Sequence, residues 1–252
     1  MTLGRAMGNR VANSQPRAVR SPPRFIASNA EAPDVADGAP SGDLPRRLLA
    51  CTTTILRERG VAFVSLRAVA QLAGVSHGAP GYYFKSKAGL LAAYATEGFQ
   101  HVASLVEAAM AAAGTDPRRR LAAAGHAYID FALGSPEQFG LMFRREMHGA
   151  GDADLERASA RLFKLVASTV QSAAKQRLIR IEDADRVAAT AWATAHGFAT
   201  LLIEGRMPAR LPTADPALLA RRSLDLLVAS LLHGDGAPAK KKRPPPKRAR
   251  PH

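Results

Sequence analysis

The chain has 252 residues, 47% of them hydrophobic, which is enough to bury a core and to form one or two domains. It contains no apolar run of the roughly 18 residues that a membrane span needs, and no apolar stretch behind its N-terminal arginines. The sequence therefore predicts neither a membrane span nor a secretory signal. The single cysteine, Cys51, rules out a disulfide within the chain and is typical of a reducing cytosol, so we expect a cytoplasmic protein.

The net charge of +14 is concentrated in two places. Residues 44–95 carry seven Lys and Arg against Glu58 alone, and residues 240–252 carry seven with no acidic residue. By contrast, residues 1–43 have five Arg and four acidic residues, and residues 96–239 have sixteen of each sign. Localised positive charge predicts a polyanionic partner, with nucleic acid favoured over an anionic membrane surface.

The same divisions predict the domain organisation. Residues 1–41 are rich in Pro, Ser, Ala, Gly and Arg without an apolar period, which is typical of a disordered arm. Residues 236–252 include KKKRPPPKRARPH and predict a disordered basic tail. Between them, alanine is abundant and apolar residues recur at intervals of three and four, so we predict an all-α fold. Its two domains are expected over 42–102 and 103–235.

The first domain begins with a regular order of helices and turns. Residues 45–59 predict a helix that ends at a glycine, and Ser65 is expected to cap a second helix, LRAVAQLA, with one apolar face. Gly74 should end that helix, and Ser76 or His77 should cap the next one. Apolar periodicity then resumes in a long helix over about 88–113. A helix, a glycine turn and a second capped helix predict a helix-turn-helix.

This layout resembles the N-terminal DNA-binding domain of the TetR family of bacterial transcription regulators over roughly residues 42–102. The resemblance is carried by an ordered set of residues: Gly60, Val64, Ser65, Leu66, Val69, Ala70, Ala73, Gly74, Val75, Ser76, Gly78, Tyr83, Phe84, Ser86, Lys87, Leu90 and Leu91. It implies a nucleoid-associated bacterial protein that binds a palindromic operator in double-stranded DNA as a homodimer.

The stretch GVSHGAPGYYFKSK, residues 74–87, departs from the family pattern. Members often have Lys, an aliphatic residue and Tyr at the positions of His77, Pro80 and Gly81. A proline is tolerated in the first turn of a helix, but a glycine costs about 1 kcal/mol relative to alanine in a helix interior. We therefore expect tertiary contacts to hold this recognition helix, with its aromatic residues as anchors: Tyr82, Tyr83 and Phe84.

In a helix-turn-helix, the start of the second helix meets the base edges. There only His77 offers a polar ring, whereas Ala79 and Pro80 offer apolar contact to a thymine methyl group. The alternatives are that His77 is a solvated surface residue and that a tyrosine packs into the core. The remaining polar side chains are expected on phosphates. The predicted DNA-binding residues are Ser65, Ser76, His77, Gly78, Ala79, Pro80, Gly81, Tyr82, Tyr83 and Lys87.

The second domain carries Trp192 and His196 four residues apart, followed by Gly197. This pattern resembles the WHG variant of the C-terminal domain of TetR-like regulators. The resemblance implies a pocket for an unknown small-molecule effector and a dimer formed by the last two helices, at about 184–204 and 216–232. The expected dimer-interface residues are Trp192, Leu201, Leu224, Leu227, Val228 and Leu231.

Aromatic residues, methionine and histidine at helical spacing give the candidate pocket residues, although such residues are more often plain core. They are His126, Tyr128, Phe131, Phe139, Met142, Phe143, Phe163, Trp192 and His196. No Cys or carboxylate stands at metal-ligand spacing from these histidines, and no nucleophile is paired with a base. We therefore predict no metal, no cofactor and no enzymatic activity.

The sequence as a whole predicts a DNA-binding transcriptional regulator, in most cases a repressor, whose DNA affinity depends on a small molecule bound in the C-terminal domain. The alternative is an architectural DNA-binding protein without ligand control, and a small helical enzyme ranks third. The basic tail is expected to add salt-sensitive, nonspecific DNA affinity.

Overall fold

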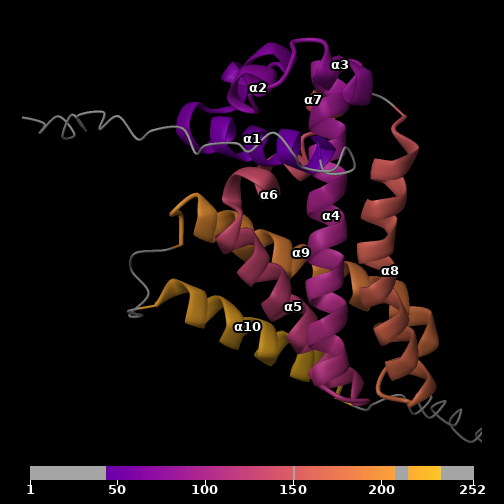
Figure 1. Ribbon diagram of the computed structural model, residues 1–252. Helices are drawn as coiled ribbons and strands as arrows, with labels where there is room; N and C mark the ends of the chain where they lie inside the picture. Colours follow the sequence, from indigo (N-terminus) through magenta and orange to yellow (C-terminus); the bar gives the residue numbers. More distant parts are fainter. Residues whose placement is uncertain (1–43, 150, 208–214, 234–252) are drawn as a thin grey trace, which may run out of the picture. The chain divides into compact units, whose positions relative to one another are not determined.

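The computed structural model describes residues 44–149, 151–207 and 215–233, and Figure 1 shows that this part of the chain consists of helices. No residue in these ranges belongs to a β-strand, so the predicted all-α fold is confirmed. The arm predicted at 1–41 and the tail predicted at 236–252 lie outside the described residues. None of the described helices is both long enough and apolar enough to cross a bilayer.

The first four helices surround one hydrophobic core. Their buried residues include Leu48 of α1, Val69 of α2, Phe84 of α3 and Leu91 of α4. The elements are α1 (Leu44–Arg59), the 3₁₀ helix η1 (Val61–Phe63), α2 (Leu66–Leu72), α3 (Ala79–Phe84) and α4 (Lys87–Ala112).

Local chemistry fixes the ends of these helices, largely as predicted. The Ser65 hydroxyl accepts a hydrogen bond from the Ala68 N–H at 3.1 Å and caps α2. At the other end, Gly74 adopts φ +66°, and the Val75 N–H donates to the Ala70 carbonyl at 3.0 Å. This pair of features is a Schellman motif, and it turns the half-buried Val75 back onto the core.

The long helix α4 leads into the second set of helices. Five of these begin with an Asp or Ser at the cap and three of the five with Pro in the first turn, which agrees with the predicted boundaries. The elements are α5 (Pro117–Gly134), α6 (Pro136–Met142), α7 (Arg145–His148), α8 (Ala153–Lys175), the 3₁₀ helix η2 (Ile181–Asp183), α9 (Ala184–Ile203) and α10 (Pro216–Leu231).

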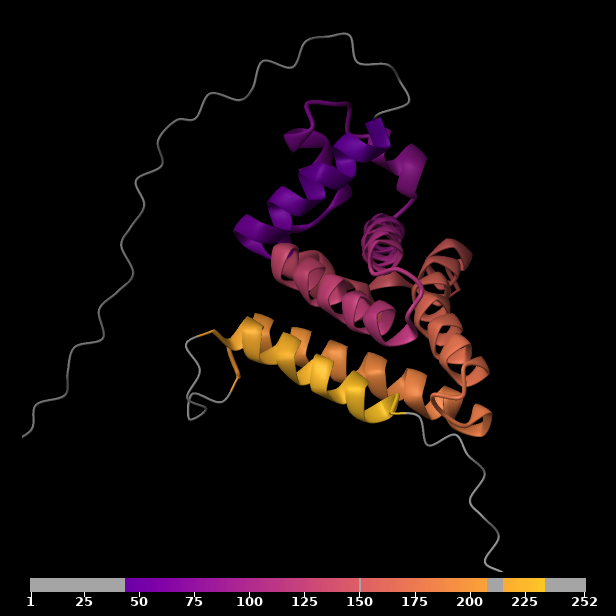
Figure 2. The same cartoon turned by 90° about the horizontal axis from the view of Figure 1, so that it is seen from below.

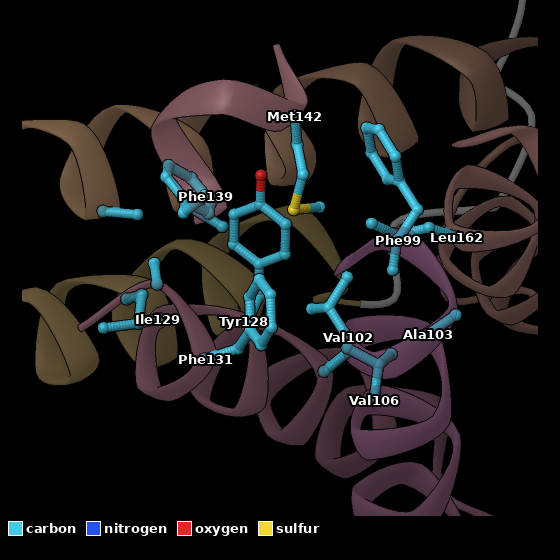
Figure 3. Packing of buried hydrophobic residues seen from close by; sticks show 14 of the residues in the cluster. Phe99, Val102, Ala103, Val106, Tyr128, Ile129, Phe131, Phe139, Met142 and Leu162 are labelled. Carbon is cyan, nitrogen blue, oxygen red and sulfur yellow. The ribbon is translucent and has the colours of Figure 1, made fainter. Parts of the chain in front are cut away.

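The lower part of α4 packs against α5 and α8 in a second core. Figure 3 shows Val102 and Val106 of α4 facing Tyr128 of α5 across this core. The short helix α6 contacts both cores, because Leu141 belongs to the first and its neighbour Met142 to the second. A third cluster joins α8, α9 and the end of α10.

We predict that Ile129→Ala destabilises the protein far more than Leu133→Ala, although the two side chains are of equal size and both lie on α5. Ile129 is fully buried in the second core, whereas Leu133 is 38% exposed. Removing a buried Ile side chain costs about 2–5 kcal/mol, through lost transfer energy and the cavity left behind. For Leu133 we expect a loss below about 1 kcal/mol. Denaturant unfolding of the two variants measures the difference, and equal losses would contradict this core assignment.

Candidate nucleic-acid interface and internal cavity

The recognition helix starts later than predicted. Helix α3 begins at Ala79, its N-cap residue is Gly78, and the Ser76 side chain makes no cap hydrogen bond. Instead the backbone carbonyl of Ser76 accepts from the Ala79 N–H at 3.0 Å, forming a turn before the helix. Pro80 thus stands at the second helical position, where its missing N–H has no helical partner to lose.

Ser76, His77 and Gly78 are exposed at the tip of this unit, as a DNA-reading segment requires. Pro80, by contrast, is buried, and its burial does not favour the predicted contact with a thymine methyl group; Ala79 is half-buried. A Cβ atom added at Gly78 or Gly81 would meet nothing within 4 Å. The front of α3 is therefore bare backbone that a ligand surface can approach closely.

The expected aromatic anchors of α3 divide into two groups. Phe84 is buried in the first core, as predicted. Tyr82 is 82% exposed and Tyr83 39% exposed, so Tyr82 does not anchor the helix. The two tyrosine rings meet edge to face at 5.2 Å and remain available to a partner. The second buried side chain of α3 is that of Pro80, a residue that usually breaks helices, and not that of Tyr82.

Basic side chains beside the helix-turn-helix donate hydrogen bonds to its backbone carbonyls. The Lys87 ammonium donates to the Val61 carbonyl at 3.0 Å and remains exposed, and the Arg47 guanidinium donates to the Ala73 carbonyl at 3.1 Å. Lys85, which the sequence analysis did not select, closes α3 with φ +62° and is exposed. The sequence could have indicated Lys85 as a candidate for phosphate contact, because it is a basic residue directly after the recognition helix. Arg59 lies over the ring of the exposed Phe63, at 4.5 Å from its centroid.

An internal cavity of about 60 Å³ lies among α4, α5, α8, α9 and α10; we call it the inner cavity. Three predicted pocket residues line it: Tyr128, Phe163 and Trp192. The rings of Phe163 and Trp192 meet edge to face at 5.4 Å, and both are partly exposed. These two side chains therefore form a partly exposed section of the cavity lining.

Tyr128 and His196 form a hydrogen-bonded pair beside the inner cavity. The Tyr128 hydroxyl lies 2.9 Å from His196 Nδ1. Burial raises the pKa of Tyr128, against a smaller opposite effect of its hydrogen bond with Trp192, and burial lowers the pKa of His196. Both side chains are therefore neutral near pH 7, and the tautomer of the His196 ring decides which of the two atoms donates. His196 also stacks among Phe139 and Phe143, with centroids 5.4 and 4.5 Å away.

The remaining pocket candidates do not line the inner cavity. Met142 and Phe143 border a second space of about 770 Å³, which we call the outer chamber and which shares Phe99, Ser159 and Trp192 with the inner cavity. Phe131 packs on His101 at 5.5 Å, away from both spaces. His126 pairs with Asp225 of α10 at 2.9 Å, so it joins two helices.

His148, the last residue of the four-residue helix α7, is not among the residues that the sequence pattern indicates. It lines the outer chamber, is 4% exposed, and its Nε2 has no hydrogen-bond partner among the described residues. So short a helix has no apolar period that would mark the residue in advance. The described residues contain no group of three His, Cys, Asp or Glu side chains that could hold a metal ion.

Helices α9 and α10 lie side by side, as Figure 2 shows. Leu224 and Val228, two of the expected interface residues, are buried in the chain's own cores. Leu227 and Leu231 are half-buried, and Trp192 lines the inner cavity. The largest apolar exposures on this pair of helices are those of Leu226 at 70%, Leu218 at 42%, Trp192 at 40% and Leu201 at 39%.

Residues 48–94 match the sequence profile of the family described as bacterial regulatory proteins, tetR family. Residues 121–227 match a profile described as tetracyclin repressor-like, C-terminal domain. This second match leaves the more specific WHG resemblance as a prediction. No match was found among the curated protein sequences.

Solved structures share the fold. A protein of unknown function from Rhodococcus sp. RHA1 is 32% identical, with a TM-score of 0.67, and the match covers 79% of this chain and 99% of that one. A TetR-like transcriptional regulator from the same organism is 22% identical, with a TM-score of 0.55, covering 78% and 100%. The TetR family regulator PfmR from Thermus thermophilus is 17% identical, with a TM-score of 0.56, covering 76% and 97%.

The two profile matches fall on the helix-turn-helix unit and on the helices around the inner cavity, and the solved structures match both parts together. The chain therefore belongs to the TetR family of bacterial transcription regulators.

Proposed function

We propose that the protein is a homodimeric repressor that binds a palindromic operator and releases it when a small molecule occupies the inner cavity and outer chamber. One observation carries the proposal: α4 and α6 each belong both to the core behind the recognition helix and to the core beside the cavity. A ligand that rearranges the second core therefore acts on elements that also position α3.

Release of DNA requires that the ligand bind two arrangements of the chain unequally. The contacts of α6 and α7 offer a route for such coupling. Met142 and Phe143 border the outer chamber, whereas Leu141 and Met147 pack on the first core. Because packed cores switch between discrete arrangements, a shift of α6 at the chamber is expected to move α1 and α4 together.

The proposed dimer uses the outward faces of α9 and α10. On α10, Leu226 and Leu218 are exposed. On α9, a Cβ added at Gly197 would meet nothing within 4 Å, so this glycine has no packing role inside the chain. A glycine there lets a helix of the partner subunit approach closely. A twofold dimer would also set two recognition helices about 34–36 Å apart, which matches successive major grooves.

Recovery of the DNA bound in cells, followed by selection of bound sequences from random DNA, tests the function as a whole. We expect one palindrome to be strongly enriched, and neighbouring genes to indicate the class of effector. Binding without a preferred palindrome would instead favour the architectural alternative.

We predict that His77→Ala relaxes the sequence preference, whereas Lys87→Ala weakens binding to all sequences. His77 is exposed just before α3, and a good base contact is worth about 1–3 kcal/mol of discrimination. A phosphate contact carries no sequence information, and its loss lowers the slope of log affinity against log salt concentration by about one. Titrations of operator and random DNA separate the two effects. The control is Lys164→Ala, which removes an exposed lysine from α8. Equal losses on both DNAs for His77→Ala would contradict its assigned role.

The dimer proposal predicts that Leu226→Glu separates the subunits. A carboxylate buried against an apolar partner surface loses its hydration without gaining a partner, so we expect the dissociation constant to rise by about tenfold or more. Sedimentation equilibrium measures this change. Leu105→Glu, at a 40% exposed position on α4, should leave the dimer intact. A dimer that tolerates both substitutions equally would place the interface elsewhere.

The tail proposal is tested by deleting residues 240–252, which removes seven basic residues. Fewer neutralised phosphates release fewer counterions, so the plot of log affinity against log salt should become less steep. The preferred DNA sequence should remain the same, because the tail is proposed to bind only the backbone. A changed operator preference would contradict this role.

A further inference from the structure

The inner cavity is built for a hydrocarbon segment. None of its lining residues carries a charge; the hydroxyls among them are that of Tyr128, which is already bonded to His196, and that of Ser159. Its volume of about 60 Å³ equals that of roughly four to six water-sized spheres, which corresponds to a short alkyl segment rather than to a whole ligand. Because the outer chamber shares Phe99, Ser159 and Trp192 with it, a longer molecule extends from one space into the other.

The outer chamber has a negative charge balance. Its lining includes three carboxylates, Glu146, Asp152 and Glu156, against one guanidinium, Arg145. Arg145 pairs with Glu156 at 3.0 Å, and Asp152 caps α8 by accepting the N–H groups of its first turn. Glu146 takes part in none of the ion pairs formed within the described residues, so its charge is the one left for a ligand.

His148 adds a hydrogen-bond acceptor at the same chamber. Burial lowers the pKa of His148, against smaller opposite effects of the Leu141 carbonyl and two carboxylates, so its ring is neutral near pH 7. With its hydrogen bond to the Leu141 carbonyl made by an N–H, the other nitrogen, Nε2, is an acceptor with no partner in the described part of the chain. A buried acceptor of this kind is stabilised by a donor and repelled by another acceptor.

We propose that the effector is a cationic amphiphile, with a hydrocarbon segment in the inner cavity and a hydrogen-bond-donating, positively charged head in the outer chamber near Glu146 and His148. This inference deepens the proposed function, since it names the class of molecule that the regulatory site takes. A carboxylate head would meet the net negative charge and offer His148 no proton.

Trp192 reports on occupancy, because it is the only tryptophan of the chain and lines both spaces. The full-length protein is titrated with three probes of equal chain length, hexylammonium, 1-hexanol and hexanoate, while tryptophan emission is followed. We expect hexylammonium to bind most tightly, 1-hexanol less tightly, and hexanoate about tenfold or more weaker than hexylammonium.

A matched pair of variants locates the head group. Glu146→Gln should weaken hexylammonium about threefold to tenfold and leave 1-hexanol within about twofold, because only the charged head loses an attraction. Glu58→Gln removes another exposed carboxylate, from α1 and outside the chamber lining, and should leave all three probes unchanged. Thermal unfolding of both variants checks that the fold is retained.

The inference is overturned if hexanoate binds as tightly as hexylammonium, if no probe changes the emission, or if Glu146→Gln behaves as Glu58→Gln does. DNA binding by the same samples separates this result from the proposed function. DNA release by hexanoate would retain the ligand-controlled regulator and reject the cationic effector. The expected order of probe affinities without DNA release would retain the cationic amphiphile as the class of ligand and reject the ligand control of DNA binding.

Discussion

The arrangement of the described helices depends on the burial of α4 along its length. Leu90, Leu91 and Tyr94 pack in the core behind the recognition helix, and Phe99 and Val102 pack in the core beside the cavity. One continuous helix of 26 residues thus has to satisfy two sets of neighbours at once. Because close-packed interiors resist small deformations, neither core can rearrange at α4 without a response in the other.

Helix α6 is a second element that links the two cores, because it packs closely against α4. A Cβ atom at Gly98 of α4 would lie 2.7 Å from the Met142 sulfur, so the two helices meet where only a glycine fits without a shift. Gln138 faces α4 as Met142 does, and its side chain donates to the Tyr94 carbonyl at 3.1 Å. Leu141 of the same helix packs in the first core, and α6 also contacts α1. The domains are therefore joined by a packed helix as well as by the covalent path through α4, which gives the proposed coupling two physical carriers.

The features that the sequence predicted well are those that neighbouring residues determine. Ser65 caps α2, and Gly74 with Val75 ends it, because a hydroxyl near free N–H groups and a glycine at positive φ act locally. The start of α3 was misplaced because the Ser76 turn uses its backbone carbonyl, which leaves no compositional signal. Pro80 was expected on the DNA and is buried, whereas Tyr82, expected both as an anchor and as a DNA contact, is exposed. Tertiary packing decides which side of a six-residue helix faces the core, and local propensity does not reveal it.

The C-terminal domain was harder to predict for a related reason. Helical periodicity identifies the apolar face of α10, but not whether that face meets the chain itself or a second subunit. Leu224 faces α5 so closely that a Cβ at Gly125 would lie 3.0 Å from it, which places this leucine in the chain's own core. Likewise, spacing placed Tyr128 and Phe131 together on α5, yet only Tyr128 reaches the inner cavity.

The short, bare front of α3 bears on how such a protein would choose its DNA. His77 is the exposed imidazole just before α3, and Gly78 and Gly81 leave open space in front of the backbone. Few base contacts then carry the discrimination, so the remaining affinity has to come from phosphate contacts and from the second subunit. Close backbone approach also makes binding sensitive to groove width and to how easily the duplex bends. Sequence preference in this protein is therefore expected to depend on DNA shape as much as on His77, and that dependence follows from the glycines and the proline that first make the segment look like a loop.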